Sequence, residues 1–252
     1  KDLLSIKKYH FQVIVTSLKQ LNDLKNTSIP FHLKINTGMN RLGLSIDDFK
    51  KAFAICRHHS EYCLKGVMTH FATSDKNHYQ YLKFKEALKG LDLTSLMIHC
   101  FSSYSLQKED LTNYCRVGIR LYGLFERDLM LKNALEIESP IAHIQKVKKG
   151  DLVGYDFQYK VKTDGYVYIL PLGYANGWGR FLKSYAYFEN IYLEQAGTIS
   201  MDYTAYFSTY KIKKDTILEL VSLHVPIEQL AQNNRISIYE ILTHLRLKRI
   251  YL

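Results

Sequence analysis

The stretch FHLKINTGMNRLGL (residues 31–44) begins with the character of a buried strand and ends as a glycine-spaced loop that carries one arginine. Upstream of it lies a β-branched, apolar run, YHFQVIVTS (residues 9–17), which also predicts a strand. Between the two runs, Leu18, Leu21 and Leu24 recur at helical spacing. Together the three segments predict a strand, helix, strand unit.

This unit repeats further along the chain. The sequence predicts helices over residues 46–59, with Ser45 as N-cap, and 79–91, and strands over residues 64–72, 95–103 and 115–124. Buried strands separated by helices imply right-handed crossovers and a parallel sheet. A complete TIM-type barrel has eight such strands, whereas this pattern contains five. The sequence therefore predicts a partial TIM-type (β/α) barrel.

The pattern changes from about Glu126. Short strands joined by glycine and polar turns are predicted within residues 134–155, 164–177, 190–208 and 215–221. The late helices predicted over residues 226–234 and 237–245 are short. This pattern is typical of an all-β domain. We therefore expect an α/β plus all-β chain, with a partial barrel over residues 1–126 and a carboxyl-terminal β domain over residues 127–252.

Composition limits the class of protein. With 47% hydrophobic and 23% charged residues, the chain can bury one large core or two smaller ones. The net charge of +10 comes from basic residues interspersed with acidic ones, so we expect no nucleic-acid partner. No apolar run approaches the roughly 18 residues that span a bilayer, so we expect no membrane segment. The cysteines lack paired or zinc-ligand spacing, which predicts thiols, a cytoplasmic location and no metal site: Cys56, Cys63, Cys100 and Cys115.

Polar residues follow the predicted barrel strands at their carboxyl ends, where barrel enzymes bind their ligands. Arg41, His70 and Ser103 lie there, as do Arg116 and Gly118. Each has a structural alternative: the histidine as a satisfied buried side chain, the serine as a turn residue, and the arginines as partners in ion pairs. Their coincidence at strand ends favours a site that binds an anion and an aromatic ring.

Six motifs occur in an order and spacing that resemble the alanine racemase family of pyridoxal-phosphate enzymes (fold type III): HLKINTGMNRLGL, GVMTHFATSD, CRVGIRLYGL, VGYDFQY, LPLGYANG and AGTISMDYT. The resemblance implies an eight-stranded barrel followed by a β domain, of which this sequence contains barrel strands four to eight. The family's Schiff-base lysine lies in a pattern close to A-V-x-K-A-N-A-Y-G, which is absent from these 252 residues.

The resemblance implies roles for the basic residues. Arg41 matches the arginine that contacts the cofactor's phenolic oxygen and the substrate carboxylate. Arg116 matches the arginine that hydrogen-bonds the pyridine nitrogen, and because arginine does not readily give up its proton, that nitrogen stays unprotonated. Lys34 matches a lysine that is carbamylated in some relatives, although a solvent-facing lysine is an equally good interpretation.

Other matching positions concern the ring and the phosphate of the cofactor. His70, Ser103 and the backbone of Gly118 and Ile119 match groups that pack on or bind the pyridoxal ring and phosphate. Leu245 falls about where the family has a phosphate-binding tyrosine.

The resemblance also implies residues that serve the opposite subunit. Tyr155, in VGYDF, matches the catalytic tyrosine, which acts as one of two opposed bases. Met201 and Asp202 match a loop whose backbone meets the substrate carboxylate, and Tyr174 matches a tyrosine of the entry corridor. This implies a homodimer with a shared active site.

The predicted function is thus pyridoxal-phosphate-dependent racemisation of L- and D-alanine, which supplies D-alanine for peptidoglycan. The alternative, suggested by the missing lysine motif, is an inactive fragment or relative that acts as a binding or assembly partner.

Overall fold

The computed structural model describes residues 3–72, 77–103, 105, 111–124 and 131–248. The chain divides into two compact units, Lys1–Gly118 and Ile119–Leu252. Glu126, the predicted domain boundary, lies outside the described residues. Each unit has its own hydrophobic core.

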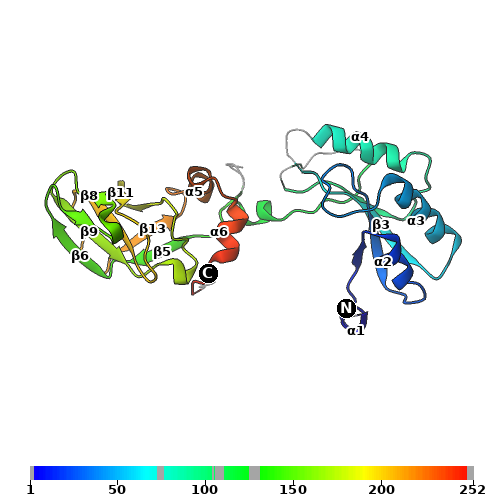
Figure 1. Cartoon of the computed structure of the whole chain (residues 1–252), viewed down its shortest axis with the longest axis horizontal. Coiled ribbons are helices and arrows are strands. Elements are labelled where there is room, and N and C mark those ends of the chain that lie inside the picture. Colours follow the sequence, from blue (N-terminus) through cyan, green and yellow to red (C-terminus); the bar gives the residue numbers. More distant parts are fainter. Residues whose placement is uncertain (1–2, 73–76, 104, 106–110, 125–130, 249–252) are drawn as a thin grey trace. The chain divides into compact units, whose positions relative to one another are not determined.

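The first unit is a parallel sheet with helices, as the repeating pattern predicted (Figure 1). Its strands run in the order β1-β2-β3-β4 and every pair is parallel. The elements are β1 (Val13–Val15), β2 (Pro30–Lys34), β3 (Cys63–Met68), β4 (Met97–His99), α1 (Leu3–Lys8), α2 (Leu18–Asp23), α3 (Ile46–His58) and α4 (Asn77–Leu88). Helix α1 was not predicted.

Two serines begin helices of this unit. The Ser45 hydroxyl accepts a hydrogen bond from the Asp48 N–H at the start of α3, which confirms the predicted cap. Ser17 caps α2 in the same way, accepting from the Gln20 N–H.

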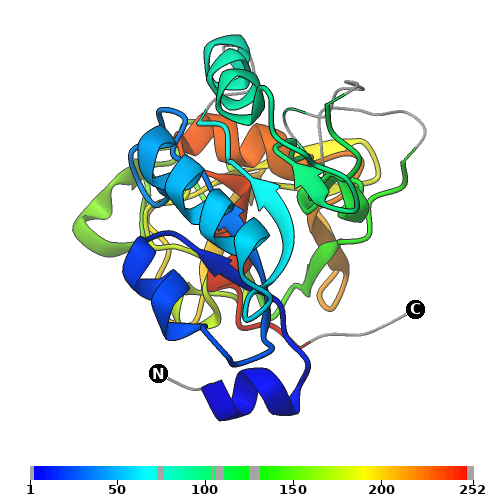
Figure 2. The same cartoon turned by 90° about the vertical axis from the view of Figure 1, so that its right-hand side faces the viewer.

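The two faces of the sheet differ in chemistry because side chains alternate along a strand. Phe31 and Leu33 of β2, and Ile35 directly after it, belong to the core that α2, α3 and α4 complete. Figure 2 shows the blue helices α2 and α3 on the same side of these strands. His32 and Lys34, the alternate residues, are also buried but lie outside that core cluster. The face away from the helices is therefore polar.

The predicted strand over residues 115–124 is wrong. Only Arg116 forms a bridge, with Ser102, and Ile119–Tyr122 form a 3-10 helix, η1. Gly123 then adopts a left-handed conformation in which a Cβ would lie 2.1 Å from the Lys132 carbonyl oxygen. The backbone turns here instead of extending, because only glycine fits this position.

The second unit is an all-β fold, as predicted, with a seven-stranded antiparallel sheet in the order β5-β13-β10-β11-β12-β9-β6 and a small hairpin, β7-β8. The prediction missed the strands β8 and β10. The elements are β5 (Ile137–Pro140), β6 (His143–Val147), β7 (Leu152–Val153), β8 (Tyr159–Lys160), β9 (Gly165–Leu170), β10 (Tyr185–Phe188), β11 (Ile191–Gln195), β12 (Thr204–Ser208), β13 (Ile217–Val221), α5 (Ile227–Asn234), α6 (Ile238–His244), η2 (Tyr155–Phe157) and η3 (Tyr174–Asn176).

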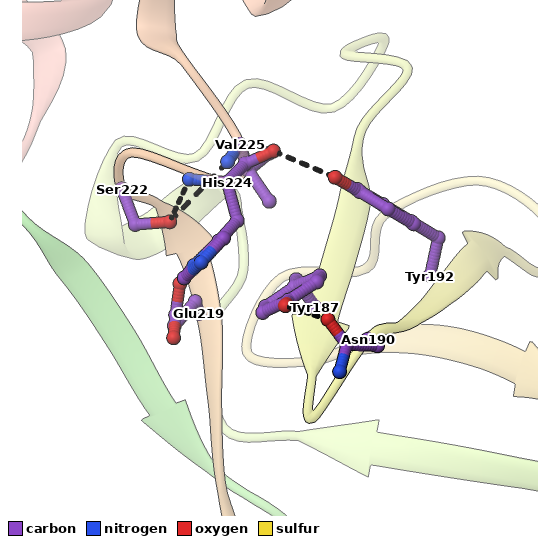
Figure 3. A network of polar contacts seen from close by, with 7 residues as sticks. All are labelled: Tyr187, Asn190, Tyr192, Glu219, Ser222, His224 and Val225. Atoms are coloured by element: carbon purple, nitrogen blue, oxygen red, sulfur yellow. Dashed lines mark hydrogen bonds and ion pairs between the residues drawn. The ribbon is translucent and has the colours of Figure 1, made fainter.

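A network of polar and ring contacts holds the turn between β10 and β11 against the segment after β13 (Figure 3). The ring of Tyr187 stacks on His224 with centroids 4.1 Å apart, and its hydroxyl donates to the Asn190 side chain. The Tyr192 hydroxyl donates to the His224 carbonyl oxygen. His224 Nδ1 lies 2.8 Å from a Glu219 carboxylate oxygen. These contacts fix the hairpin on its neighbours.

Two expectations from composition concern the whole chain. In the part that the structure describes, no helix is long and apolar enough to cross a bilayer. The predicted thiols are confirmed, because the cysteines are free: Cys56, Cys63, Cys100 and Cys115.

Candidate functional site

The loop after β2 presents Arg41. The Asn36 side-chain oxygen accepts hydrogen bonds from the N–H groups of Gly38 (3.1 Å) and Asn40 (3.0 Å), which closes the loop on itself. The Asn36 N–H also donates to the Leu44 carbonyl oxygen. The backbone of this loop is held by hydrogen bonds at both ends, so Arg41 lies on a fixed turn after the carboxyl end of β2. Its side chain is exposed.

Arg116 is the most connected of the predicted residues in the first unit. Its guanidinium donates to the carbonyl oxygens of Thr69 (2.9 Å) and His99 (3.1 Å). It also lies 2.6 Å from His99 Nδ1 and 3.3 Å from His70 Nδ1. These acceptors are all neutral, and in the described part of the chain no carboxylate pairs with Arg116. The half-buried positive charge is therefore not neutralised by this chain's described side chains.

The basic side chains influence one another. Burial lowers the pKa of Lys34, and the positive charges of Arg41 and Arg116 lower it further. Burial also lowers the pKa of His70, as do Arg116, Arg41 and Lys34. The interpretation of Lys34 as a solvent-facing residue is wrong, because its side chain is only 8% exposed. Lys34, Arg41 and Arg116 thus form a positive cluster around a neutral His70 at the carboxyl ends of the strands.

A buried amide on α4 fixes the segment that carries His70. Gln80 Oε1 accepts from the Ala72 N–H (2.7 Å), and its Nε2 donates to the His70 carbonyl oxygen (3.4 Å) and the Thr37 hydroxyl (3.2 Å). The Thr37 and Thr69 hydroxyls lie 2.8 Å apart. These contacts join the ends of β2 and β3, and sequence reasoning did not find them.

Hydroxyl groups lie beside the two predicted backbone donors. In the first unit, the Gly118 N–H donates to the buried Ser103 hydroxyl (2.8 Å). In the second unit, the Ile119 N–H donates to the Tyr239 hydroxyl (3.4 Å). Tyr239 lies on α6 and was not predicted, because within SIYEILTHL it resembles any other residue of an amphipathic helix.

Tyr155 lies at the tip of the β7-β8 hairpin in the second unit. Its side chain is 65% exposed and makes no hydrogen bond to the described residues. Asp156 and Phe157 both adopt left-handed backbone conformations, which are uncommon outside glycine. The side chains of Gln158 and Thr198 hydrogen-bond at 2.8 Å, so the hairpin is anchored to the segment after β11.

Met201 and Tyr174 lie together in the second unit. The N–H groups of Tyr174 and Ala175 donate to the carbonyl oxygens of Ser200 and Met201, respectively. Met201 is 54% exposed. The predicted site residues thus fall in both units, with Arg41, His70, Ser103, Arg116 and Gly118 in the first and Tyr155, Tyr174, Met201 and Asp202 in the second.

Family models match both units. Residues 1–126 match the model described as alanine racemase, N-terminal domain, and residues 134–251 match alanine racemase, C-terminal domain. The chain belongs to the alanine racemase family. This racemase-family chain is 36% identical to alanine racemase 1 of Bacillus subtilis over 174 residues, which are 63% of this chain and 45% of that protein. It is also 36% identical to the alanine racemase of Geobacillus stearothermophilus, over 62% of this chain and 44% of that protein.

Solved structures of alanine racemases share the fold. The crystal structure of the Bartonella henselae enzyme with covalently bound pyridoxal phosphate has a TM-score of 0.88 and 25% identity, and the match covers 98% of this chain and 75% of that one. The Bacillus anthracis enzyme with bound L-Ala-P has a TM-score of 0.84 and 25% identity, covering all of this chain and 73% of that one. This racemase-family chain therefore spans about half the length of the curated relatives it matches and three quarters of the solved chains.

Proposed function

We propose that this chain takes part in pyridoxal-phosphate-dependent racemisation of alanine. The observation that carries the proposal is the half-buried Arg116, which in the described part of the chain has only neutral hydrogen-bond partners, beside Lys34 and Arg41. An uncompensated cluster of positive charge at strand ends favours an anionic ligand. Membership of the racemase family supports this choice of ligand and reaction.

The donor set fits the cofactor. A guanidinium presents several N–H donors in one plane and keeps its charge, so Arg116 would hold the nitrogen of an aromatic ring as an acceptor. In the first unit, the Ser103 hydroxyl and the backbone at Gly118 would bind the phosphate. When bound, pyridoxal phosphate withdraws electrons from the α-carbon of the amino acid and so makes its proton easier to remove.

Racemisation requires a proton to leave one face of the α-carbon and another to arrive on the opposite face. In this proposal Arg41 binds the substrate carboxylate and Tyr155 exchanges the proton on one face. No residue of this chain is assigned to the opposite face. The exposed side chains of Tyr155 and Met201 support a role in the site of a second copy, because neither is covered by its own unit.

The proposal extends to the setting of the reaction. A homodimer with a shared site would cover the exposed hairpin tip. The product, D-alanine, would serve peptidoglycan synthesis. Free cysteines, of which Cys115 is exposed, support a cytoplasmic location.

The test is isotope exchange coupled to inversion. The protein is incubated with pyridoxal phosphate and L-alanine in D2O. The two enantiomers are then separated by chiral chromatography, and their deuterium content is measured by mass spectrometry. We expect D-alanine that carries deuterium at the α-carbon. Saturable binding of pyridoxal phosphate without formation of D-alanine would contradict the proposal.

A further inference from the structure

A row of hydrogen bonds runs behind Arg116, across the polar face of the sheet. Arg116 Nη1 lies 2.6 Å from His99 Nδ1. His99 Nε2 lies 2.9 Å from His32 Nδ1. His32 Nε2 lies 2.7 Å from the Gln12 side-chain oxygen. The row therefore links β4, β2 and the residue just before β1 to the guanidinium.

The two ends of this row fix the same direction for every hydrogen bond. An arginine can only donate, so His99 Nδ1 must accept and its hydrogen must be on Nε2. His99 Nε2 then donates to His32 Nδ1, which leaves the hydrogen of His32 on its own Nε2. The oxygen of Gln12 can only accept, and it lies opposite that Nε2. Both imidazoles are therefore neutral and carry their hydrogen on Nε2.

Independent features of the structure agree with this assignment. The two imidazoles lie edge to face, with centroids 4.9 Å apart and an angle of 69°. Burial and the charge of Arg116 lower the pKa of both His32 and His99, so neither ring needs to carry a charge. Gly66 leaves room for His32, because a Cβ at residue 66 would lie 2.3 Å from His32 Nδ1.

We propose that His32 is a positioning residue for Arg116, acting through His99: by accepting the hydrogen of His99 Nε2, it holds the His99 ring where Nδ1 accepts from the guanidinium. Without that acceptor, the buried Nε2–H of His99 would lose its partner, and the ring would turn to find another one, which lengthens the hydrogen bond between Nδ1 and Arg116. The inference rests on the proposed function only in the role given there to Arg116.

The experiment is nitrogen NMR of the histidine rings in the 15N-labelled chain at pH 7, which reports which ring nitrogen carries hydrogen. It needs neither cofactor nor turnover, so its failure is distinguishable from failure of the racemase proposal. For the unaltered chain we expect His32 and His99 to carry hydrogen on Nε2 alone. Hydrogen on Nδ1 of His99, or on both of its nitrogens, would overturn the proposal.

Variants test the direction of the effect. In His32→Phe, which keeps a ring but removes the acceptor, we expect the His99 hydrogen to stay on Nε2 and the Nδ1 signal to move towards that of a nitrogen that accepts no hydrogen bond. In His32→Gln, whose side-chain oxygen can accept, we expect the Nδ1 signal to return to its original position. The control His143→Phe changes an exposed ring in the second unit and should leave the His99 signals unaltered.

An unchanged His99 in folded His32→Phe, or no recovery in His32→Gln, would overturn the role of His32. If His32→Phe does not fold, the unaltered chain decides alone, since the proposal requires hydrogen on Nε2 of both rings.

Discussion

The backbone N–H of Ala175 donates to the carbonyl oxygen of Met201 at 3.0 Å. One residue earlier, the Tyr174 N–H donates to the Ser200 carbonyl oxygen at 3.1 Å. The turn that carries Tyr174 and the loop that carries Met201 are therefore a single unit of backbone structure. A change in either segment is expected to move the other.

Gly173 lies in tight backbone contact with the loop that carries Met201. A Cβ at residue 173 would lie 2.2 Å from the Met201 carbonyl oxygen, which is backbone and cannot rotate away. We expect Gly173→Ala to lower the free energy of unfolding by about 1–3 kcal/mol, as overpacking does, and to raise KM for alanine if Met201 meets the substrate. Urea unfolding and steady-state kinetics measure the two effects.

The matched control is Gly179→Ala, whose added Cβ would make only an ordinary contact with Leu182 at 3.4 Å. If Gly173→Ala unfolds at the same urea concentration as this control, the contact at Gly173 does not constrain the Met201 loop.

Replacing Tyr155 is expected to lower activity without lowering the free energy of unfolding. Its side chain is exposed and its hydroxyl has no partner among the described residues, so Tyr155→Phe should leave the free energy of unfolding within about 0.5 kcal/mol of the unaltered protein. A lost proton-transfer group should lower kcat by about 10²–10⁴-fold. Tyr210→Phe, which removes a hydroxyl from another exposed tyrosine of the second unit, is the control for both measurements. Equal activity of the two variants would remove Tyr155 from the mechanism.

The buried imidazoles predict a loss of stability in acid. Burial, together with the charge of Arg116 and the repulsion that a protonated His32 would add, lowers the pKa of His99 from 6.5 to about 4. The unfolded chain therefore binds more protons than the folded one between these values, so this contribution is fully present above pH 6.5 and is lost as the pH falls towards 4. The loss attributable to His99 should not exceed about 3 kcal/mol.

Unfolding in urea at several pH values between 7 and 4.5 measures this slope. His99→Gln should flatten it, whereas His143→Gln, at an exposed position, should not. His32 and His70 also have lowered pKa values and add to the slope in both variants. A slope that is the same in His99→Gln and the unaltered chain would show that His99 does not resist protonation.

Gly66 gives a test of packing around His32. A Cβ at residue 66 would lie 2.3 Å from His32 Nδ1 and 2.4 Å from the Met97 carbonyl oxygen, so Gly66→Ala should cost about 1–3 kcal/mol of stability. His32→Ala removes one of the two clashes. The double variant should therefore lose less stability than the sum of the single variants by at least about 0.5 kcal/mol. Additive losses of stability would show that the added Cβ clashes with the Met97 carbonyl oxygen and not with His32.

Sequence patterns predicted most of the fold because they reflect burial. The apolar strands and the helical repeat of the first unit gave its parallel order, and Ser45 marked the start of α3. The predicted strand over residues 115–124 failed because its apolar composition hides the turn at Gly123. Strand β10 was missed because its four residues, YAYF, show no alternation of polar and apolar side chains.

The candidate site was predictable only in part. Arg41 and His70 follow β2 and β3 in the sequence, so the parallel pairing of these strands explains why their segments lie at the same edge. Arg116 joins that edge through its bridge with Ser102, which the sequence did not predict. His32, His99 and Gln80 were missed because a polar residue inside a strand or helix has no sequence signal that separates a contact from solvent exposure. Those contacts join elements far apart in the chain. Roles of individual residues stay predictions until the variants are measured.

The direction shared by the hydrogen bonds behind Arg116 has an electrostatic consequence. Each neutral imidazole is a dipole whose electron-rich nitrogen faces the arginine side of the row, so the dipoles of His99 and His32 add head to tail. They solvate the guanidinium much as oriented water would, without contributing a counter-ion. The cation is thus held in a half-buried place while its whole unit charge stays available to an incoming anion.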